Sequence, residues 1–452
     1  MRHPLLRPRR LPPLLALLVL APPPLAAASL AERVEAELPE LLDLYRELHA
    51  RPEISYLEEA TAARMAAELS AAGYEVVERV GDYGVEGRVS YGVVGVLANG
   101  DGPVIMVRTD LDALPVEEET GLEYASRHRM TAEDGEEVAT MHACGHDLHM
   151  ASFVGAARLL ASMRDAWSGT LVMIGQPAEE RGAGAKAMLE DGLYERFPRP
   201  EAALALHASA ALPAGQIGVV PGYALANVDS VDIAVRGKGG HGAWPHTTHD
   251  PVTLAAQIIV NLQTIVSRKV SPLAPAVITV GSIHGGTKHN IIPNRVDLKL
   301  TVRSYEPGVR RTLLDGIRRT ATQTARAAGF PEELLPEVRV REEESTPSTY
   351  NDPGLAERLS AVWREVLGEE AVRTVDPVMG GEDFSRFGLE GEVPIQIFWL
   401  GAVDPQRVES AEASGEPLPS LHSSRFAPLP EPALATGVTA MTAAVLELMG
   451  GR

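Results

Sequence analysis

The chain has 452 residues, 45% of them hydrophobic and 23% charged, so it is long and apolar enough to bury more than one core. Its formal net charge is −20 at pH 7. An acidic protein of this kind repels phosphate backbones, which argues against nucleic acid as a partner.

The first 28 residues predict a secretory signal peptide. Arginines at the start are followed by the apolar run Leu14–Leu20 and by the small residues Ala26–Ala28. Arg9-Arg10 leaves twin-arginine export open, although the Leu-Pro-Pro that follows fits it poorly. No later stretch reaches about 18 consecutive apolar residues, so we expect an exported protein, periplasmic or extracellular, without a stable membrane span.

Strands and helices alternate through the first half of the chain. The pattern predicts helices over 58–73, 150–163 and 183–193, and strands over 74–80, 92–98, 104–110, 169–177 and 201–209. Alternation of this kind predicts an α/β layer with a mainly parallel sheet.

The pattern changes near residue 222. Strands are expected over 230–237, 276–283, 296–304 and 338–344, with helices over 250–267 and 308–329. The order βαββαβ is that of the split ferredoxin-like arrangement. After residue 344 the α/β pattern of the first half resumes. We therefore predict a catalytic domain over 29–221 and 344–452, with an α+β domain inserted at 222–343.

Polar residues follow the predicted strands at their carboxyl ends, where ligand sites of open α/β sheets collect. These residues are Asp110, Asp112, Glu179, Glu180 and His207. Cys144, the only cysteine of the chain, and His146 precede the next helix. A thiolate with imidazoles and carboxylates is a ligand set for zinc and related divalent metals, and ligands so far apart in the chain favour an open catalytic site.

Two of these interpretations have plain alternatives. Cys144 alone fits a small buried hydrophobe, because free cysteine is often buried. Glu179 and Glu180 alone fit two solvated loop acids. If they are functional, adjacent acids in an extended segment point to opposite sides. One would then ligate metal while the other acts as general base.

Six motifs raise the functional interpretation above these alternatives. In chain order they are MHACGHDLHMA, GQPAEE, GGHGAWPH, NIIPNRVDLKLTVRS, MGGEDF and LHSSRF. Their order resembles the metal-dependent amidohydrolases that include aminoacylases, hippurate hydrolase and auxin-conjugate (IAA-amino acid) hydrolases, a family of co-catalytic metallopeptidases. The resemblance runs from about residue 35 to the C-terminus. It implies a zinc-exopeptidase-like catalytic domain and two divalent ions per subunit, with Zn, Mn, Co and Ni not distinguished.

The resemblance also implies roles for individual residues. The implied metal ligands are Cys144, His146, Glu180, His207 and His422. Glu179 would be the general base and Asp112 would orient a ligand. The inserted domain would be a lid and dimerisation domain, in which His241 supports the oxyanion in a neighbouring subunit. Asn294 and Arg303 would hold the polar end of the substrate.

We therefore expect a homodimeric hydrolase that cleaves the amide bond of N-acyl amino acids or related small conjugates. A dipeptidase or carboxypeptidase with the same site is the alternative within this class. A catalytically silent binding or scaffold protein is the alternative from another class, disfavoured because the base and all five ligands are present. One departure from the family pattern, Ala208-Ser209-Ala210-Ala211 in place of a bulky turn, leaves the shape of the substrate pocket open.

Overall fold

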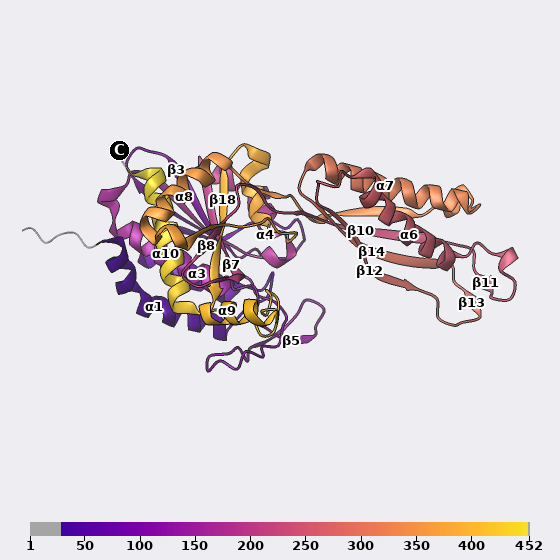
Figure 1. Cartoon of the computed structure of the whole chain (residues 1–452), viewed down its shortest axis with the longest axis horizontal. Helices are drawn as coiled ribbons and strands as arrows, with labels where there is room; N and C mark the ends of the chain where they lie inside the picture. Colours follow the sequence, from indigo (N-terminus) through magenta and orange to yellow (C-terminus); the bar gives the residue numbers. More distant parts are fainter. Residues whose placement is uncertain (1–28, 451–452) are drawn as a thin grey trace, which may run out of the picture.

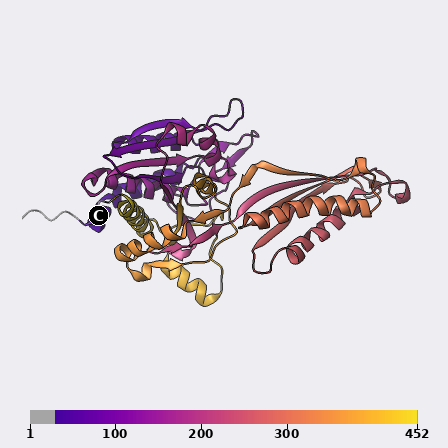
Figure 2. The ribbon, with the colours of Figure 1, turned by 90° about the horizontal axis from the view of Figure 1, so that it is seen from above.

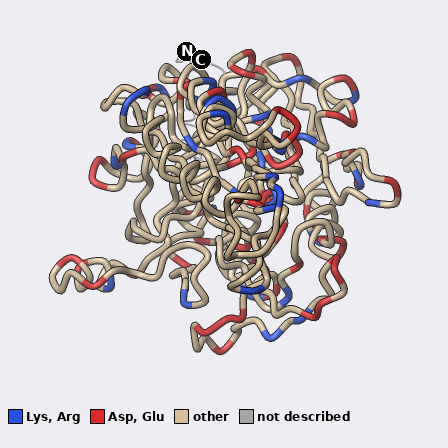
Figure 3. The backbone as a smooth tube through the Cα atoms, turned by 90° about the vertical axis from the view of Figure 1, so that its right-hand side faces the viewer, with Lys and Arg blue, Asp and Glu red and all other residues tan. Residues whose placement is uncertain are grey.

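The computed structural model of the protein describes residues 29–450, and the predicted signal peptide lies outside them (Figure 1). The described chain forms a broad body around an eight-stranded sheet and an elongated arm around a four-stranded sheet. Asp and Glu are spread along the trace with Lys and Arg between them (Figure 3).

The large sheet is parallel at its centre and mixed toward its edges. Its strands, in spatial order, are β1 (Glu75–Val80), β2 (Gly92–Asn99), β6 (Gly169–Gln176), β3 (Val104–Asp110), β7 (Ala202–Pro213), β18 (Ile395–Val403), β8 (Ile217–Val219) and β17 (Val372–Thr374). β6, β3, β7 and β18 pair in parallel, whereas β2 pairs antiparallel with β1 and β6. The link between β1 and β2 is too short for a helical crossover, which accounts for that antiparallel edge. The α/β prediction is confirmed, with a more mixed sheet than the sequence indicates.

Helices cover both faces of this sheet. One face carries α1 (Leu30–Ala50), α2 (Glu59–Ala71), α3 (His146–Ser162), α8 (Pro353–Leu367) and α10 (Pro430–Met449). The other carries α4 (Gly184–Glu190), α5 (Leu193–Arg196) and the 3₁₀ segment η6 (Asp383–Gly391). α9 (Pro405–Ser414) and the hairpin of β4 (Arg129–Thr131) and β5 (Glu137–Ala139) lie outside these layers.

α10 bears on the expectation that the chain has no stable membrane span. Within residues 29–450 it is the one helix that is long and apolar enough to cross a membrane by length and composition. It packs against α3, α1 and α8, and 67% of its most apolar window is buried inside the protein. A core helix that is buried on most sides is apolar nearly all round, so it has the length and composition of a membrane-spanning helix without being one.

The arm has the βαββαβ order expected from the sequence. Its elements are β10 (Asn227–Arg236), α6 (Pro251–Lys269), β12 (Ala276–Gly285), β14 (Arg295–Ser304), α7 (Pro307–Ala327) and β15 (Glu337–Thr346). The strands pair antiparallel in the order β12-β14-β10-β15. Figure 2 shows both helices on one face of this sheet. Along β10, buried side chains alternate with half-buried ones, and the buried apolar ones pack in one core with α6 and α7.

Two short strands connect the arm to the body. β9 (Gly222–Leu225) pairs antiparallel with β16 (Thr349–Asn351), so the chain enters and leaves the arm side by side. The predicted boundary at residue 222 falls at the start of β9, and the boundary at 343 falls inside β15. β11 (Gly240–His241) and β13 (Ile291–Ile292) form a small ribbon at the far end of the arm (Figure 1).

A buried histidine of α1 joins three segments of the body. Nδ1 of His49 lies 2.6 Å from Asp147 at the start of α3, and Nε2 lies 3.2 Å from Glu118 in a loop. Burial by itself lowers the pKa of His49, but the hydrogen bonds to both carboxylates outweigh it and raise the pKa from 6.5 to about 10. His49 is therefore an imidazolium that donates to two buried carboxylates and offsets part of their charge.

This histidine predicts a pH dependence of stability. Its folded-state pKa is raised, so its contribution is complete below pH 6.5 and disappears as pH rises through about 10. We expect the free energy of unfolding to fall across this window by up to about 1.4 kcal/mol per pH unit, and His49→Gln to remove that slope. Urea unfolding of both proteins between pH 6 and 10 measures it, with the exposed His246→Gln as control. Equal slopes in wild type and His49→Gln would contradict the assignment.

Candidate metal centre

The candidate ligands come from loops at the carboxyl ends of the central parallel strands. Cys144 and His146 stand at the start of α3, and Glu180 lies in the 3₁₀ turn η2 (Glu179–Arg181) after β6. His207 belongs to β7, and His422 comes from the loop after α9. This is the edge at which ligand sites of open α/β sheets form.

A glycine permits the close approach of the first two segments. Gly145, at the N-terminus of α3, has φ +83°, a conformation that favours glycine. A Cβ on Gly145 would lie 2.9 Å from the Cβ of Ala208. The small residues at both positions therefore let the loop that carries Cys144 reach the end of β7.

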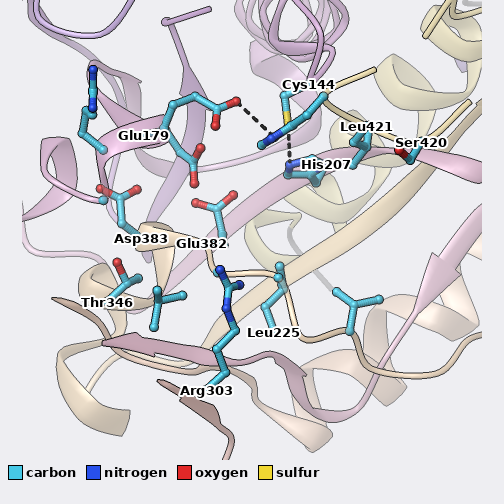
Figure 4. Close-up of a pocket in the computed structure, with 18 of the residues that line it drawn as sticks. Cys144, Glu179, His207, Leu225, Arg303, Thr346, Glu382, Asp383, Ser420 and Leu421 are labelled. Atoms are coloured by element: carbon cyan, nitrogen blue, oxygen red, sulfur yellow. Dashed lines mark hydrogen bonds and ion pairs between the residues drawn. The ribbon is translucent and has the colours of Figure 1, made fainter. Parts of the chain in front are cut away.

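The five predicted ligands converge, and Figure 4 shows Cys144 and His207 next to each other. Sγ of Cys144 lies 3.6 Å from Nε2 of His207 and 3.3 Å from Nε2 of His422. Oε1 of Glu180 lies 3.5 Å from Nε2 of His422 and 3.9 Å from Nε2 of His146. The side chains thus point their donor atoms at a common centre.

The donor atoms of this centre fit a divalent metal ion. Nδ1 of His146 lies 2.7 Å from the carbonyl of Asp112, and Nδ1 of His207 lies 2.9 Å from the carbonyl of Ala208. A carbonyl only accepts, so both Nδ1 atoms carry the hydrogen and both Nε2 lone pairs face the centre. Nε2 of His146 and Oε1 of Glu180 are buried and have no hydrogen-bond partner among the described residues. A metal would satisfy both atoms.

The charge of the centre favours a cation. Burial lowers the pKa of His146, but carboxylates led by Asp110 raise it to about 10. Burial raises the pKa of Glu180 to about 7, and it raises the pKa of the Cys144 thiol well above its usual range, with Glu180 adding to the rise. Protons occupy these ligands in the absence of another cation, and a metal would displace them.

Asp112 contacts the imidazole of the proposed ligand His146 and also the turn of the two glutamates. Its carboxylate accepts the backbone N–H groups of Glu179 at 3.1 Å and Glu180 at 3.0 Å, and the hydroxyl of Ser55 at 2.6 Å. Its Oδ1 also lies 3.6 Å from Nδ1 of His146, the ring nitrogen that lies 2.7 Å from the backbone carbonyl of Asp112. The Asp112 side chain therefore holds the turn of the two glutamates.

A buried arginine network adjoins the centre, and the sequence analysis missed it. Arg108 lies in β3 and is 2% exposed. Its guanidinium contacts Asp110 and Glu382 at 2.9 Å each and Asp383 at 3.4 Å. Burial raises the pKa of Glu179 well above its usual range, and Glu382 adds to this. Two sequence features could have indicated this network: an arginine within the apolar run VIMVRTD, and the adjacent acids of MGGEDF.

The remaining histidines of the MHACGHDLHM segment are buried. Nδ1 of His149 lies 2.7 Å from Asp110, and its Nε2 accepts the N–H of Ala208 at 2.7 Å. His149 thereby ties α3 to the end of β7. His142 is 2% exposed, and its ring nitrogens have no hydrogen-bond partner within residues 29–450.

The predicted residues of the arm separate into two places. Arg303 lines the same cleft as Cys144, Glu179 and His207, and donates to the carbonyl of Met379 at 2.7 Å (Figure 4). His241 is exposed in β11, at the far end of the arm (Figure 1). Asn294 is close to it in the fold, since its Oδ1 accepts the N–H of Gly239 at 2.8 Å. Within one chain, only Arg303 lies with the metal ligands.

The short residues after His207 enlarge the cleft. Ser209, Ala210 and Ala211 line it, together with apolar side chains that include Leu212 and Trp399. The cleft has a volume of about 1710 Å³ and runs between the body and the base of the arm. A small conjugate would fill only part of it.

Comparison with known proteins identifies the family. Residues 106–446 match the model of peptidase family M20/M25/M40. The chain belongs to this family. An N-acetyl-L-cysteine deacetylase of Bacillus subtilis is 35% identical over 350 residues, covering 77% of each chain. Thermostable carboxypeptidase 2 of Saccharolobus solfataricus is 35% identical over 379 residues, covering 82% of this chain and 89% of the relative.

A solved M20 structure is also similar. The Bacillus subtilis YXEP protein, a dinuclear metal-binding peptidase of the M20 family, superposes with a TM-score of 0.69 at 30% identity. The match covers 91% of this chain and 98% of that protein. The family resemblance and the fold class predicted from the six motifs are confirmed.

The geometry of this M20 centre predicts the effect of losing its thiol. Cys144→Ser replaces a thiolate by a neutral hydroxyl that a metal does not readily deprotonate. We expect metal affinity to fall by more than the roughly 10–100-fold that loss of an outer hydrogen-bond partner causes. Elemental analysis after dialysis against defined free metal measures it, and circular dichroism checks the fold. Full occupancy in a folded Cys144→Ser protein would return the cysteine to a packing role.

Proposed function

We propose that the protein is an exported metal-dependent amidohydrolase that cleaves the amide bond of N-acyl amino acids or related small amide conjugates. The observation that carries the proposal is the convergence of Cys144, three histidines and Glu180 beside the free carboxyl group of Glu179. Membership of the M20 family and the similarity to a deacetylase of an N-acyl amino acid support the same chemistry.

The arrangement of donors supports two metal ions in one centre. Cys144, His146 and His207 form one group of possible ligands, and Cys144, Glu180 and His422 form another. In each group the donor atoms lie within 4.8 Å of one another. Because Cys144 belongs to both groups, it would contribute to holding metal in either of them. The donor set fits Zn, Mn, Co and Ni alike.

Glu179 is the residue placed to move protons. Its Oε2 lies 4.0 Å from Nε2 of His146, so the carboxyl group borders the ligand cluster without being held by it. Divalent metal held by the cluster supplies Lewis acidity, which polarises the amide carbonyl and lowers the pKa of water. Glu179 takes a proton from the attacking water and passes it to the leaving amine, and its raised pKa suits it to hold that proton in between.

Arg303 is suited to bind the carboxylate of the substrate. It is half-buried and forms no salt bridge within the described chain, and burial lowers its pKa. One Nη group donates to the Met379 carbonyl, Nε donates to the hydroxyl of Thr301 at 3.4 Å, and the side chain lines the cleft. A guanidinium binds a carboxylate through two parallel hydrogen bonds, which favours substrates with a free carboxylate.

The position of His241 supports a homodimer. It lies at the far end of the arm from the ligands of its own chain, so it would support the oxyanion only in a partner subunit. β12 is an edge strand of the arm with Ile283 52% exposed, and α6 exposes Val260 at 68%. An unpaired edge with apolar residues is suited to pairing with a second copy.

The substrate class is tested by turnover of the metal-loaded protein. We expect N-acyl amino acids to be cleaved with a higher kcat/KM than dipeptides of matched sequence. Methyl esterification of the substrate carboxylate should lower kcat/KM by roughly 10–100-fold, because Arg303 loses a charged partner. Preference for dipeptides would favour the peptidase alternative, which the similarity to a carboxypeptidase supports. No turnover of either class at full metal occupancy would favour a binding protein.

Two matched variants serve as controls for this assay. Glu179→Gln should retain metal and lower turnover by roughly 10²–10⁴-fold, as expected for loss of a general base. Glu180→Gln should lose metal as well as turnover. If the two variants lose metal and activity to the same extent, the division of roles between the adjacent acids is wrong.

A mixing experiment tests the role of His241 across the dimer. A mixed dimer of His241→Ala and Glu179→Gln subunits has one site with both defects and one site with neither. Random exchange makes about half of the dimers mixed, so about a quarter of the wild-type rate should return by two-fold symmetry. Labelled subunits report the exchange. Confirmed exchange without any recovery of activity would exclude the role in the partner.

A further inference from the structure

The turn that carries Glu179 and Glu180 is held through three successive backbone N–H groups. The N–H of Ala178 donates to Oε1 of Glu58 at 2.8 Å. The next two N–H groups, of Glu179 and Glu180, donate to the two oxygens of Asp112. The buried carboxyl groups of Glu58 and Asp112 therefore fix the backbone from which Glu179 and Glu180 project.

The first residue of this turn has an unfavourable conformation. Ala178 has φ +48° and ψ +43°, in the left-handed region that residues with a Cβ rarely adopt. It is fully buried, so its N–H has no access to water when the hydrogen bond to Glu58 is lost. Surrounding contacts must hold such a residue, because on its own the chain relaxes to negative φ.

The side chain of Glu58 contacts the turn and does not cap the helix that begins after it. It occupies the N-cap position of α2 but its side chain makes no capping hydrogen bond. Its carboxyl group is 0% exposed and accepts the N–H groups of Tyr56 and Ala178, while Oε2 has no partner among the described residues. A buried carboxyl group is costly, and capping its helix would have kept it at the surface.

We propose that Glu58 is a positioning residue for the general base: by holding the N–H of Ala178 it keeps the left-handed turn that directs Glu179 into the cleft. The proposal rests on the proposed function of Glu179. It adds the segment between α1 and α2 to the site, where Ser55 contacts Asp112 and Glu58 contacts Ala178. Loss of this hold lets the turn relax, so the carboxyl group of Glu179 leaves its catalytic position for part of the time.

Variants of Glu58 separate positioning from general stability. Burial, with the charge of Asp112, raises the pKa of Glu58 to about 8, so its carboxyl group is protonated at neutral pH and Gln is a close mimic. Glu58→Gln should therefore retain most of kcat. Glu58→Ala should lower kcat by about 10–100-fold with KM and metal content little changed. Glu59→Ala, at the exposed next position, is the control.

A second-site change tests the mechanism directly. Glycine adopts positive φ without the penalty that alanine has, so Ala178→Gly should partly restore kcat when added to Glu58→Ala, by about 5–30-fold. A residue that only stabilises the fold would not be rescued by this change at the turn. Should Glu58→Ala not fold, Glu58→Asp takes its place, because the shorter side chain does not reach the Ala178 N–H.

Hydrogen exchange makes the result independent of turnover. In metal-loaded protein, Glu58→Ala should accelerate amide exchange in the peptide that covers residues 178–182, whereas Glu58→Gln and Glu59→Ala should not. Unchanged exchange, or an unchanged kcat in Glu58→Ala, overturns the proposal. Failure of the wild-type protein to cleave any amide overturns the proposed function instead, and the exchange result then still reports whether Glu58 holds the turn.

Discussion

A buried excess of carboxyl groups at the carboxyl ends of the central strands is the constraint on which the rest of the structure depends. Asp110, Asp112, Glu179, Glu382 and Asp383 are all buried there, and Glu58 and Glu180 lie beside them. Buried acids are stable only when they are protonated, paired or bound to metal. Each feature of the site is a way to meet one of these conditions.

The acids are satisfied in three ways. On one side, Arg108 neutralises part of the charge by contacts with Asp110, Glu382 and Asp383. In the middle, backbone N–H groups donate to both oxygens of Asp112 and to one oxygen of Glu58. On the open side, the thiol, the imidazoles and Glu180 surround a centre that a divalent cation would complete. Glu179 stands between the arginine and this centre, and burial together with the charge of Glu382 raises its pKa.

The division of the molecule into body and arm follows from the chemistry of the cleft. The proposed metal ligands all come from the body, and most lie on segments fixed by the parallel strands and α3. The arm contributes Arg303 at its base and carries His241 at its far end. The two-stranded connection of β9 and β16 joins these parts, so a movement of the arm would change the distance between Arg303 and the ligands.

Much of this protein was determined by local sequence pattern. Periodicity predicted the α/β body and the βαββαβ arm, because a strand or helix with one buried face must repeat its apolar residues at a fixed interval. The motifs predicted the family, and the five proposed ligands meet in the structure because they lie at strand ends that a parallel sheet brings to one edge.

Other features were decided only by tertiary structure. The partners of Arg108 lie up to 275 positions away, and Glu58 meets a turn 120 positions later, so no local pattern indicates either contact. α10 has the composition of a membrane helix, and only its packing places it in a core. The separation of His241 from its own ligands likewise follows from the length of the arm. In each case the physical reason is the same: periodicity is a property of neighbouring residues, whereas the pairing of a buried charge depends on segments that meet only in the folded chain.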